Sequence, residues 1–351
     1  MDYRIPQFAP YLGLEELQQL TYCIADNWIT AGKKVSQFEA AVADMHGVER
    51  AIALCNGTMA LWAIFQSIDI KGCEVIVPDF TFIATAGAVS WAGGIPRFAD
   101  VDKETLQIDP QSVEKLINVR TKAIVPVNMF GKNYEVEAIQ EIAKKHGLII
   151  IEDAAQALGV SYKGEMAGTF GKASMISFFG DKICTSAEGG MVLTDDDALY
   201  EKILRLKNQG NLSTGNYKNE TLGLNLRMSD LHAAVGLGQL EKFDWIAKRK
   251  LEIYEEYKKH GIKLLPMEHG ELPFRIVAFV NDAEATRLKM AEHSIECRRV
   301  FYPLHLQPYY KDNSDCPNSV WAYEHGLALP SSVLLKDSEI KEVCETLNAN
   351  S

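Results

Sequence analysis

Features that mark membrane-bound, secreted or nucleic-acid-binding proteins are scarce in this sequence of 351 residues. No apolar run approaches the roughly 18–20 residues that a membrane span needs. The first residues lack a basic region followed by an apolar run, so no secretory signal is expected. The formal net charge of -11 argues against general binding to nucleic acid or to a membrane surface. An anionic substrate is still possible, because a local cluster of Lys and Arg can override the global sign.

Disulfide and metal-site patterns are also missing. The 7 cysteines are odd in number and scattered, with no Cys-x-x-Cys pair, and the 8 histidines show no His-x-x-x-His spacing. This favours reduced thiols in a cytoplasmic protein and predicts no metal site. Hydrophobic content of 47% and charged content of 24% are ordinary for a globular protein of this length.

From about residue 51 to residue 194, short apolar runs alternate with amphipathic ones. Strands are predicted at 51–55, 74–78, 123–127, 148–151, 174–178 and 190–194, and helices at 59–67, 83–92 and 136–146. Such alternation predicts an α/β fold with a mostly parallel sheet covered by helices on both faces.

The composition changes after about residue 210. Residues 211–222 are polar and rich in Asn, which predicts an exposed or interface loop. One long helix is predicted from Ser229, a plausible N-cap, through Lys259. A strand at 275–280 and a helix at 284–293 follow. We therefore expect a large domain over residues 1–244 and a smaller α+β domain over residues 245–351.

Two polar residues at the ends of predicted strands carry the strongest chemical signal. Asp153 follows one strand, and Lys182 comes about 30 residues later in a loop rich in glycine and aromatic residues. Alone, Lys182 is more often a surface lysine, and Asp153 is more often a cap or an ion-pair partner. Together they match what pyridoxal phosphate requires, an amine that forms a Schiff base and a carboxylate that keeps the pyridine nitrogen protonated. Partial burial would lower the pKa of the lysine and favour its nucleophilic form.

A phosphate site is predicted between the first strand and its helix. Free backbone N–H groups at the start of a helix attract phosphate, and Asn56-Gly57-Thr58 offers such groups and a hydroxyl. Ser177 offers a further hydroxyl. The plain alternatives are an Asn-Gly turn with a Thr cap and an ordinary serine at a strand end. Phe82 is equally suited to stacking on a cofactor ring and to packing in the core.

The segment from Glu296 to His305 combines adjacent arginines with aromatic residues. Guanidinium groups bind phosphate oxygens in bidentate fashion, so this segment suits a sugar diphosphate. A solvated basic turn is the alternative.

Taken together, these motifs resemble those of the DegT/DnrJ/EryC1/StrS family of sugar aminotransferases over nearly the whole chain. The motifs that carry the resemblance are Asn56-Gly57-Thr58, 78–85, 100–102, 152–156, the Lys182 loop, 225–229 and 301–305. The resemblance implies a fold-type I enzyme with a mostly parallel seven-stranded sheet and a smaller C-terminal domain. It also implies pyridoxal phosphate as the cofactor, with L-glutamate and a nucleotide-linked sugar as substrates.

The same resemblance implies residue roles. Lys182 would hold the cofactor covalently and move protons, Asp153 would pair with the pyridine nitrogen, and Gln156 would contact the ring hydroxyl. The other positions that would stack on the ring or hold the phosphate are Phe82, Gly57, Thr58 and Ser177.

Further implied roles concern a second subunit and the sugar. Asn225 would reach the phosphate of the neighbouring subunit's cofactor, which implies a homodimer with shared active sites. Arg299, Tyr302 and His305 would line the sugar-nucleotide side.

The Lys182 loop also bears on the substrate. Relatives with histidine at this position dehydrate their substrate, whereas this chain keeps the lysine, which favours amine transfer. The loop is most similar to that of members that aminate carbon 4 of 4-keto-6-deoxyhexoses, such as the GDP-perosamine synthases of O-antigen (lipopolysaccharide) biosynthesis. Members acting at carbon 3 tend to carry a Tyr-Pro version. One departure is that many carbon-4 members read Thr-Thr-Gly-Glu-Gly-Gly, whereas this chain reads Thr185-Ser186-Ala187-Glu188-Gly189-Gly190.

Three other functions compete with this interpretation. One is a 3-aminotransferase of a dTDP-3-keto-6-deoxyhexose, and another is a non-catalytic, pyridoxal-phosphate-binding regulatory protein. The third is a nicotinamide-dependent epimerase or dehydratase, which needs a glycine-rich fingerprint after the first strand. Residues 51–58 contain one glycine, which argues strongly against that third function.

Overall fold

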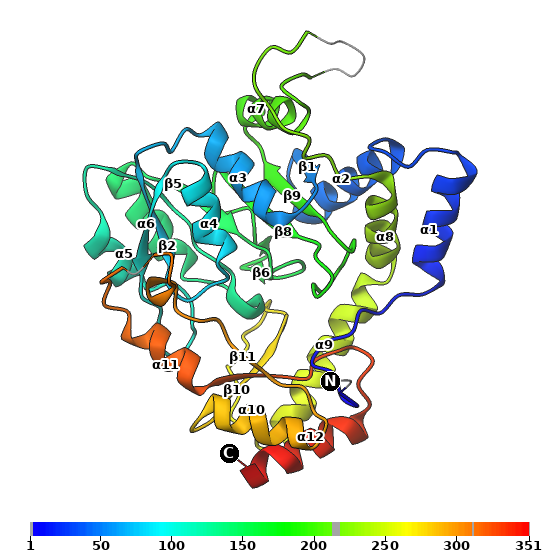
Figure 1. Ribbon diagram of the computed structural model, residues 1–351, viewed down its shortest axis with the longest axis vertical. Helices are drawn as coiled ribbons and strands as arrows, with labels where there is room; N and C mark the ends of the chain where they lie inside the picture. The colour runs from blue at the N-terminus through cyan, green and yellow to red at the C-terminus, as the bar shows by residue number, and fades with distance from the viewer. Residues whose placement is uncertain (1–2, 213–217, 311, 351) are drawn as a thin grey trace.

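The computed structural model describes residues 3–212, 218–310 and 312–350, so the middle of the predicted 211–222 loop lies outside the described residues. A seven-stranded sheet forms the upper part of the molecule in Figure 1. Its strands, in spatial order, are β1 (Arg50–Leu54), β9 (Gly190–Thr194), β8 (Ala173–Ser177), β5 (Ile149–Asp153), β4 (Thr121–Ile124), β2 (Glu74–Pro78) and β3 (Ile95–Ala99). Only β9 runs against its neighbours β1 and β8, so the sheet is mostly parallel, as the sequence predicts.

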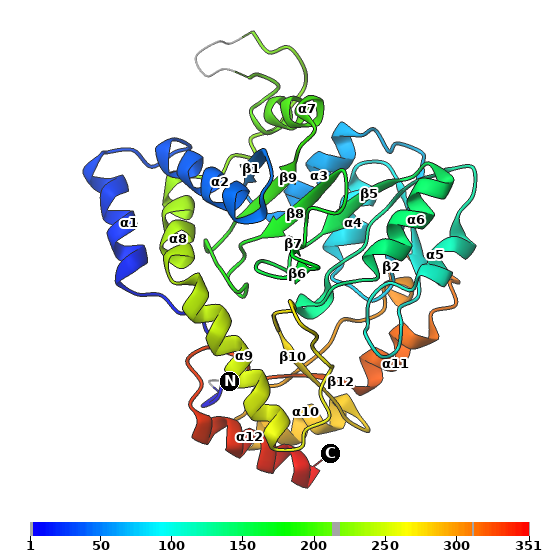
Figure 2. The same cartoon turned by 180° about the vertical axis from the view of Figure 1, so that it is seen from behind.

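Helices cover both faces of this sheet because successive side chains along each strand point to opposite sides. Val75 and Val77 of β2 pack in one buried cluster, while Ile76 between them packs in the other. Figure 1 looks onto the first face, which is covered by α3 (Gly57–Ser67), α4 (Ala84–Trp91) and α7 (Asp197–Lys207). The opposite face, seen in Figure 2, is covered by α2 (Lys33–His46), α5 (Pro110–Leu116), α6 (Val136–His146) and α8 (Asp230–Glu241).

A second, smaller unit lies below the large sheet in both views. Its three-stranded antiparallel sheet has the order β10 (Ile276–Phe279), β12 (Gly326–Leu329) and β11 (Arg298–Arg299). Around it lie α9 (Phe243–Lys259), α10 (Ala283–Glu292), α11 (Pro317–His325) and α12 (Asp337–Asn350). Ile5 is buried in the core of this unit, so the first residues of the chain pack with its last hundred. The predicted division at residue 245 stays a prediction.

The remaining elements are short or peripheral. They are α1 (Leu14–Ala25), the hairpin β6 (Ser161–Tyr162) and β7 (Glu165–Met166), and the 3-10 turns η1 (Met129–Gly131) and η2 (Leu304–Leu306). All seven cysteines are unpaired. Within the described residues, none of the helices combines the length and apolar character that crossing a bilayer requires.

The prediction of one helix from Ser229 to Lys259 is wrong. Ser229 does cap a helix, because its side chain accepts a hydrogen bond from His232 N, but that helix, α8, ends at Glu241. Lys242 has non-helical angles of φ -114° and ψ 13°, and α9 begins after it. The ammonium of Lys242 binds the buried carboxylate of Glu16 on α1, at 2.7 Å. This contact between distant segments marks the break, and the apolar periodicity of the sequence gives no sign of it.

A buried ion pair connects the two units. Lys132, which follows η1, places Nζ 2.6 Å from Glu271 Oε2 and 2.7 Å from the Pro266 carbonyl oxygen. The two side chains are 2% and 4% exposed, so neither charge has access to water. Glu271 accepts two further backbone hydrogen bonds, from Asn133 and Glu268.

We expect Lys132→Met to cost about 3–5 kcal/mol of unfolding free energy, because it leaves the Glu271 carboxylate buried without its cation. The midpoint of urea unfolding measures this loss. Lys163→Met is the matched control, since the Lys163–Glu137 pair is exposed and its removal should leave the midpoint unchanged. Equal shifts of the urea midpoint in the two variants would contradict the conclusion that the buried Lys132–Glu271 pair stabilises the fold.

Candidate active site

The carboxyl ends of five parallel strands, β1, β8, β5, β4 and β2, meet at one edge of the large sheet. Asp153 ends β5, Ser177 ends β8, and Gly57 begins the helix that follows β1. Because parallel strands bring their ends to the same edge, side chains far apart in sequence converge there. A cavity of about 380 Å³ opens at this edge.

Most of the predicted cofactor-binding residues lie on the wall of this cavity. They are Gly57, Thr58, Phe82, Asp153, Gln156, Ser177 and Lys182. The remaining predicted residues, which do not line it, are Asn225, Arg299, Tyr302 and His305.

Lys182 lies in the loop between β8 and β9, and its side chain is 15% exposed. Its Nζ lies 4.6 Å from the centre of the Phe274 ring and 3.9 Å from Asp181 Oδ1. Burial lowers the pKa of Lys182 below that of a free lysine; the charges of Asp181 and Asp153 oppose the effect, and that of Arg275 adds to it. A lysine in this setting loses its proton more readily, and the neutral amine is the form that attacks a carbonyl carbon.

Asp153 is buried, and two donors hold its carboxylate. The Thr85 hydroxyl donates to Oδ2 at 2.7 Å, and the Ala155 amide donates to Oδ1 at 3.2 Å. Burial raises the pKa of Asp153, and these two hydrogen bonds, with the nearby Lys182 charge, oppose the rise. A cation bound beside this carboxylate would favour its ionised form further.

The start of α3 has the features of an anion site. Asn56 caps the helix by accepting a hydrogen bond from Met59 N at 2.9 Å. Among the described residues, no acceptor faces the amides of Gly57 and Thr58, which open the helix. A Cβ at Gly57 would lie 2.9 Å from Met175 Sδ and 3.4 Å from Ser177 Oγ, so glycine permits this close approach of α3 to β8. Two free amides and two hydroxyls at a helix N-terminus suit a phosphate group.

Gln156 and Phe82 lie elsewhere on the wall. The Gln156 amide oxygen accepts a hydrogen bond from Phe130 N at 2.8 Å. Its amide nitrogen has only a weak contact with Met129 Sδ, at 4.0 Å, and so keeps donors for a bound oxygen. Phe82 is 55% exposed, which is more typical of a ring that meets a ligand or a partner than of a core residue.

Residues from the segment near residue 300 take other positions. His305 is buried, and its Nδ1 and main-chain N lie 2.8 and 2.7 Å from the two oxygens of Asp79. Arg299 stacks on the Tyr323 ring at 3.5 Å and donates to the Tyr323 carbonyl oxygen. Their predicted contact with the sugar nucleotide stays a prediction, as does that of Tyr302. Phe301, from the same segment, is on the cavity wall.

Asn225 is exposed on the segment that leads to α8. Its predicted role concerns a neighbouring subunit and also stays a prediction.

Sequence reasoning missed Phe274 and Arg275, both of which line the cavity. Arg275 was expected only as the first residue of a strand, and no motif surrounds it. Thr85 was part of a motif, but its bond to Asp153 was not anticipated. Thr85 lies in the first turn of α4, four residues after Thr81, and its hydroxyl also lies 3.2 Å from the Thr81 hydroxyl.

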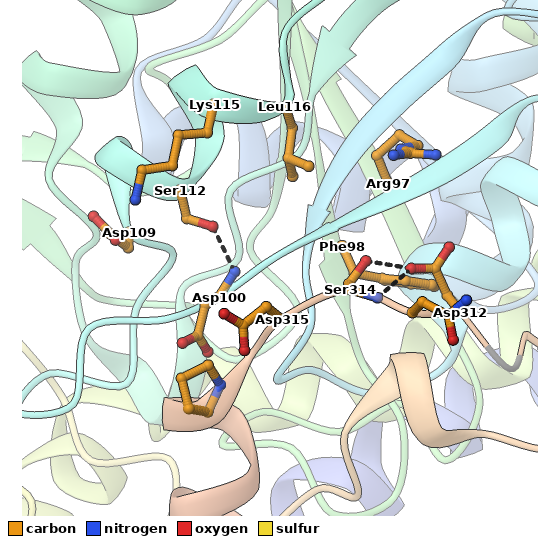
Figure 3. A pocket seen from close by; sticks show the side chains of 12 residues that line it. Arg97, Phe98, Asp100, Asp109, Ser112, Lys115, Leu116, Asp312, Ser314 and Asp315 are labelled. Carbon is orange, nitrogen blue, oxygen red and sulfur yellow. Dashed lines mark hydrogen bonds between the residues drawn. The ribbon is translucent and has the colours of Figure 1, made fainter.

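A larger cavity of about 590 Å³ lies between β3, α5 and the segment before α11 (Figure 3). Among the described residues on its wall, none was predicted to act on a ligand. Its polar groups largely serve local structure: Ser112 Oγ accepts from the Asp100 amide, and Asp312 accepts from Ser314, as Figure 3 shows. The cavity at Lys182 is therefore the candidate active site.

Comparisons with known proteins agree with the fold and identify the family. A sequence model of the DegT/DnrJ/EryC1/StrS aminotransferase family matches residues 10–348. The GDP-perosamine synthase of Escherichia coli O157:H7 is 37% identical over 356 residues, and that of Vibrio cholerae is 35% identical over 360 residues; each alignment covers 98% of both proteins. Helicobacter pylori PseC, an aminotransferase involved in the biosynthesis of pseudoaminic acid, is 25% identical, with a TM-score of 0.94 over 100% of this chain and 99% of that one. The predicted fold class is confirmed.

Ala187 is one of the two residues at which the loop departs from the expected sequence, and its backbone is strained. Its φ of 68° lies in the left-handed region, which an L-residue other than glycine adopts at a cost of about 1–2 kcal/mol. Glycine, the residue expected here in many carbon-4 members, adopts this conformation freely.

We therefore expect Ala187→Gly to raise the unfolding free energy by about 1 kcal/mol, after the entropy that glycine adds to the unfolded chain is subtracted. Ala285→Gly is the control, because Ala285 lies in the right-handed helix α10 and glycine should destabilise it by about 0.5–1 kcal/mol. Urea unfolding of both variants shows whether the unfolding free energy rises in Ala187→Gly and falls in Ala285→Gly. A fall in both variants would contradict the conclusion that the backbone at Ala187 is strained.

Proposed function

This chain belongs to the DegT/DnrJ/EryC1/StrS aminotransferase family, and on that premise we propose that it aminates carbon 4 of a nucleotide-linked 4-keto-6-deoxyhexose with L-glutamate as donor. The chain is a pyridoxal-phosphate-dependent sugar aminotransferase, as are the relatives and solved structures to which it is similar. The position on the sugar and a GDP-perosamine synthase-like product are our proposal. Full-length identity of 35–37% to two GDP-perosamine synthases is the observation that supports it.

The cavity fits pyridoxal phosphate. An amine, a buried carboxylate and a helix N-terminus line the same space, and they suit in chemistry the aldehyde, the ring nitrogen and the phosphate of the cofactor. We propose that Lys182 holds the cofactor covalently, that Asp153 pairs with the ring nitrogen and that Gln156 donates to the ring hydroxyl. The groups that would hold the phosphate or stack on the ring are Gly57, Thr58, Ser177 and Phe82.

When bound, the cofactor supplies an electron sink and carries the amino group from one substrate to the other. The chain's own contribution is proton transfer and charge placement. Lys182 Nζ, released when a substrate amine takes its place, removes the proton from Cα of glutamate and later delivers a proton to carbon 4 of the sugar. Asp153 keeps the proton on the ring nitrogen, and its two hydrogen bonds hold the carboxylate in position for this.

The proposal includes a homodimer with shared active sites. Phe82 and Phe179, on the cavity wall, are 55% and 48% exposed, which suits a surface that a second copy covers. Asn225 and Arg227 are also exposed, and the hydrogen bonds of their side chains are to Arg227 N and Asn208 of the same surface, so a second copy could meet them there. A role in O-antigen biosynthesis and a cytoplasmic location, where sugar nucleotides are made, complete the proposal.

A non-catalytic regulatory protein is the main alternative, and the amine half-reaction separates the two. We expect Lys182→Ala to abolish conversion of the cofactor by L-glutamate, because no other base replaces Nζ. Asp153→Asn should slow the conversion by at least about a hundredfold, since a neutral ring withdraws electrons poorly. Stopped-flow absorbance measures both rates. Asp109→Asn, at the N-cap of α5, is the control, and a near wild-type rate in Asp153→Asn would remove that residue from its role.

The substrate is tested with a panel of sugar nucleotides. Purified protein with L-glutamate should aminate a GDP-linked 4-keto-6-deoxyhexose and release one 2-oxoglutarate per amino sugar, as mass spectrometry and coupled absorbance can show. dTDP- and UDP-linked 4-keto sugars show which nucleotide the enzyme accepts. A dTDP-3-keto-6-deoxyhexose shows whether it aminates carbon 3 instead of carbon 4. Exclusive use of the 3-keto sugar would overturn the carbon-4 assignment.

A further inference from the structure

One positive charge on the cavity wall has no part in the proposed cofactor contacts. Of the described residues that line the cavity, Lys182 and Arg275 are the cationic ones. Lys182 is committed to the cofactor, which leaves Arg275. An α-amino acid that enters as amino donor brings a carboxylate into the same cavity, and an anion withdrawn from water needs a cation or several hydrogen bonds.

Arg275 is paired with the residue next to the reactive lysine. Its Nη2 donates to Asp181 Oδ2 at 2.6 Å, and the two side chains are 15% and 20% exposed. This is a single hydrogen bond, although a guanidinium carries five N–H donors and commonly binds a carboxylate through two. Arg275 Nε and Asp181 Oδ1 are buried and form no hydrogen bond within the described part of the chain. The pair is therefore incomplete on both sides.

The position of the pair matches that of a donor carboxylate. Asp181 Oδ1 lies 3.9 Å from Lys182 Nζ, too far for a hydrogen bond but close enough for charge interaction. The donor nitrogen must come to the place of Lys182 Nζ, and its α-carboxylate is attached to the adjacent carbon. Asp181 already holds a carboxylate near Lys182 Nζ and hydrogen-bonded to Arg275, which is where the α-carboxylate of the donor would lie.

The main chain of Arg275 is held firmly, so its side chain can change partners without moving the loop. The preceding residue, Phe274, donates its amide to the Phe130 carbonyl oxygen at 3.0 Å. The Phe274 carbonyl oxygen accepts from Lys250 Nζ at 2.8 Å, and the same nitrogen donates to the Ser331 carbonyl oxygen at 2.9 Å. The buried amino group of Lys250 thus joins α9, the Arg275 segment and the segment after β12.

We propose that Arg275 binds the α-carboxylate of the amino donor and that Asp181 neutralises Arg275 while no donor is bound. The inference rests on the proposed function only in taking L-glutamate as the donor, and it is independent of the sugar. The competing explanation is that the ion pair only braces the Lys182 loop against the smaller unit. If the ion pair only holds the loop in place, removing either partner should weaken donor binding equally. If Arg275 binds the donor carboxylate, removing Arg275 should weaken binding and removing Asp181 should not.

The test compares Arg275→Gln with Asp181→Asn in the cofactor-loaded protein. Stopped-flow mixing with L-glutamate gives an apparent Kd and a limiting rate for each variant, and calorimetry with 2-methyl-L-glutamate, which has no α-proton, gives a Kd without turnover. We expect Arg275→Gln to raise both Kd values about 10- to 100-fold, the loss of one charged hydrogen bond. Asp181→Asn should leave them unchanged or lower them, because it removes a competing carboxylate.

Three controls sharpen the comparison. Arg275→Lys keeps the charge and should give an intermediate Kd, and it carries the test if Arg275→Gln does not fold. Arg287→Gln, which breaks an ion pair within α10 away from the cavity, should bind like wild type. 4-Aminobutyrate, which lacks the α-carboxylate, should bind wild type and Arg275→Gln equally.

The outcomes separate this inference from the proposed function. A wild-type Kd in Arg275→Gln, or equal increases in Arg275→Gln and Asp181→Asn, would overturn the inference and leave the sugar assignment intact. A large increase in Arg275→Gln alone would support it, even if no 4-keto sugar in the panel accepted the amine.

Discussion

The convergence of strand ends at one edge of a sheet buried on both faces is the constraint on which the site depends. The strands are fixed by apolar side chains that alternate between the two helical layers, so a shift of register would move every one of them to the wrong face. Asp153 and Ser177 end adjacent parallel strands, and Gly57 follows a third that runs the same way. Their meeting at one cavity is a consequence of the topology, independent of any ligand.

Burial at this edge gives the polar groups their chemistry. The same exclusion of water lowers the pKa of Lys182 and raises that of Asp153, which brings the two values closer together than in water. Lys182 loses its proton readily, which suits attack on the aldehyde of the cofactor. Asp153 is stabilised in its charged form by a neighbouring positive charge, which a protonated ring nitrogen would supply. The hydrogen bonds from Thr85 and Ala155 hold the carboxylate in place without supplying the missing charge.

Local patterns in the sequence were sufficient for six of the seven strands of the large sheet, all but β3, and for a set of predicted cofactor-binding residues of which most line one cavity. Apolar runs and glycine-marked strand ends are local signals, and Asp153 and Lys182 follow directly from them. The break at Lys242 has no local signal in the sequence, and the residue at the break is paired with a carboxylate on α1, far away in the chain. Arg275 reaches Asp181 across 94 residues of sequence, and the burial of His305 against Asp79 spans 226. Contacts of this kind depend on how the two units meet, which periodicity does not encode.

The most direct test of this account is to find where the cofactor is attached. The protein should be isolated with pyridoxal phosphate, reduced with borohydride, digested and analysed by mass spectrometry. The account predicts a phosphopyridoxyl group on the peptide that contains Lys182 and on no other. Attachment at a different lysine, or no adduct after saturation with the cofactor, would contradict it.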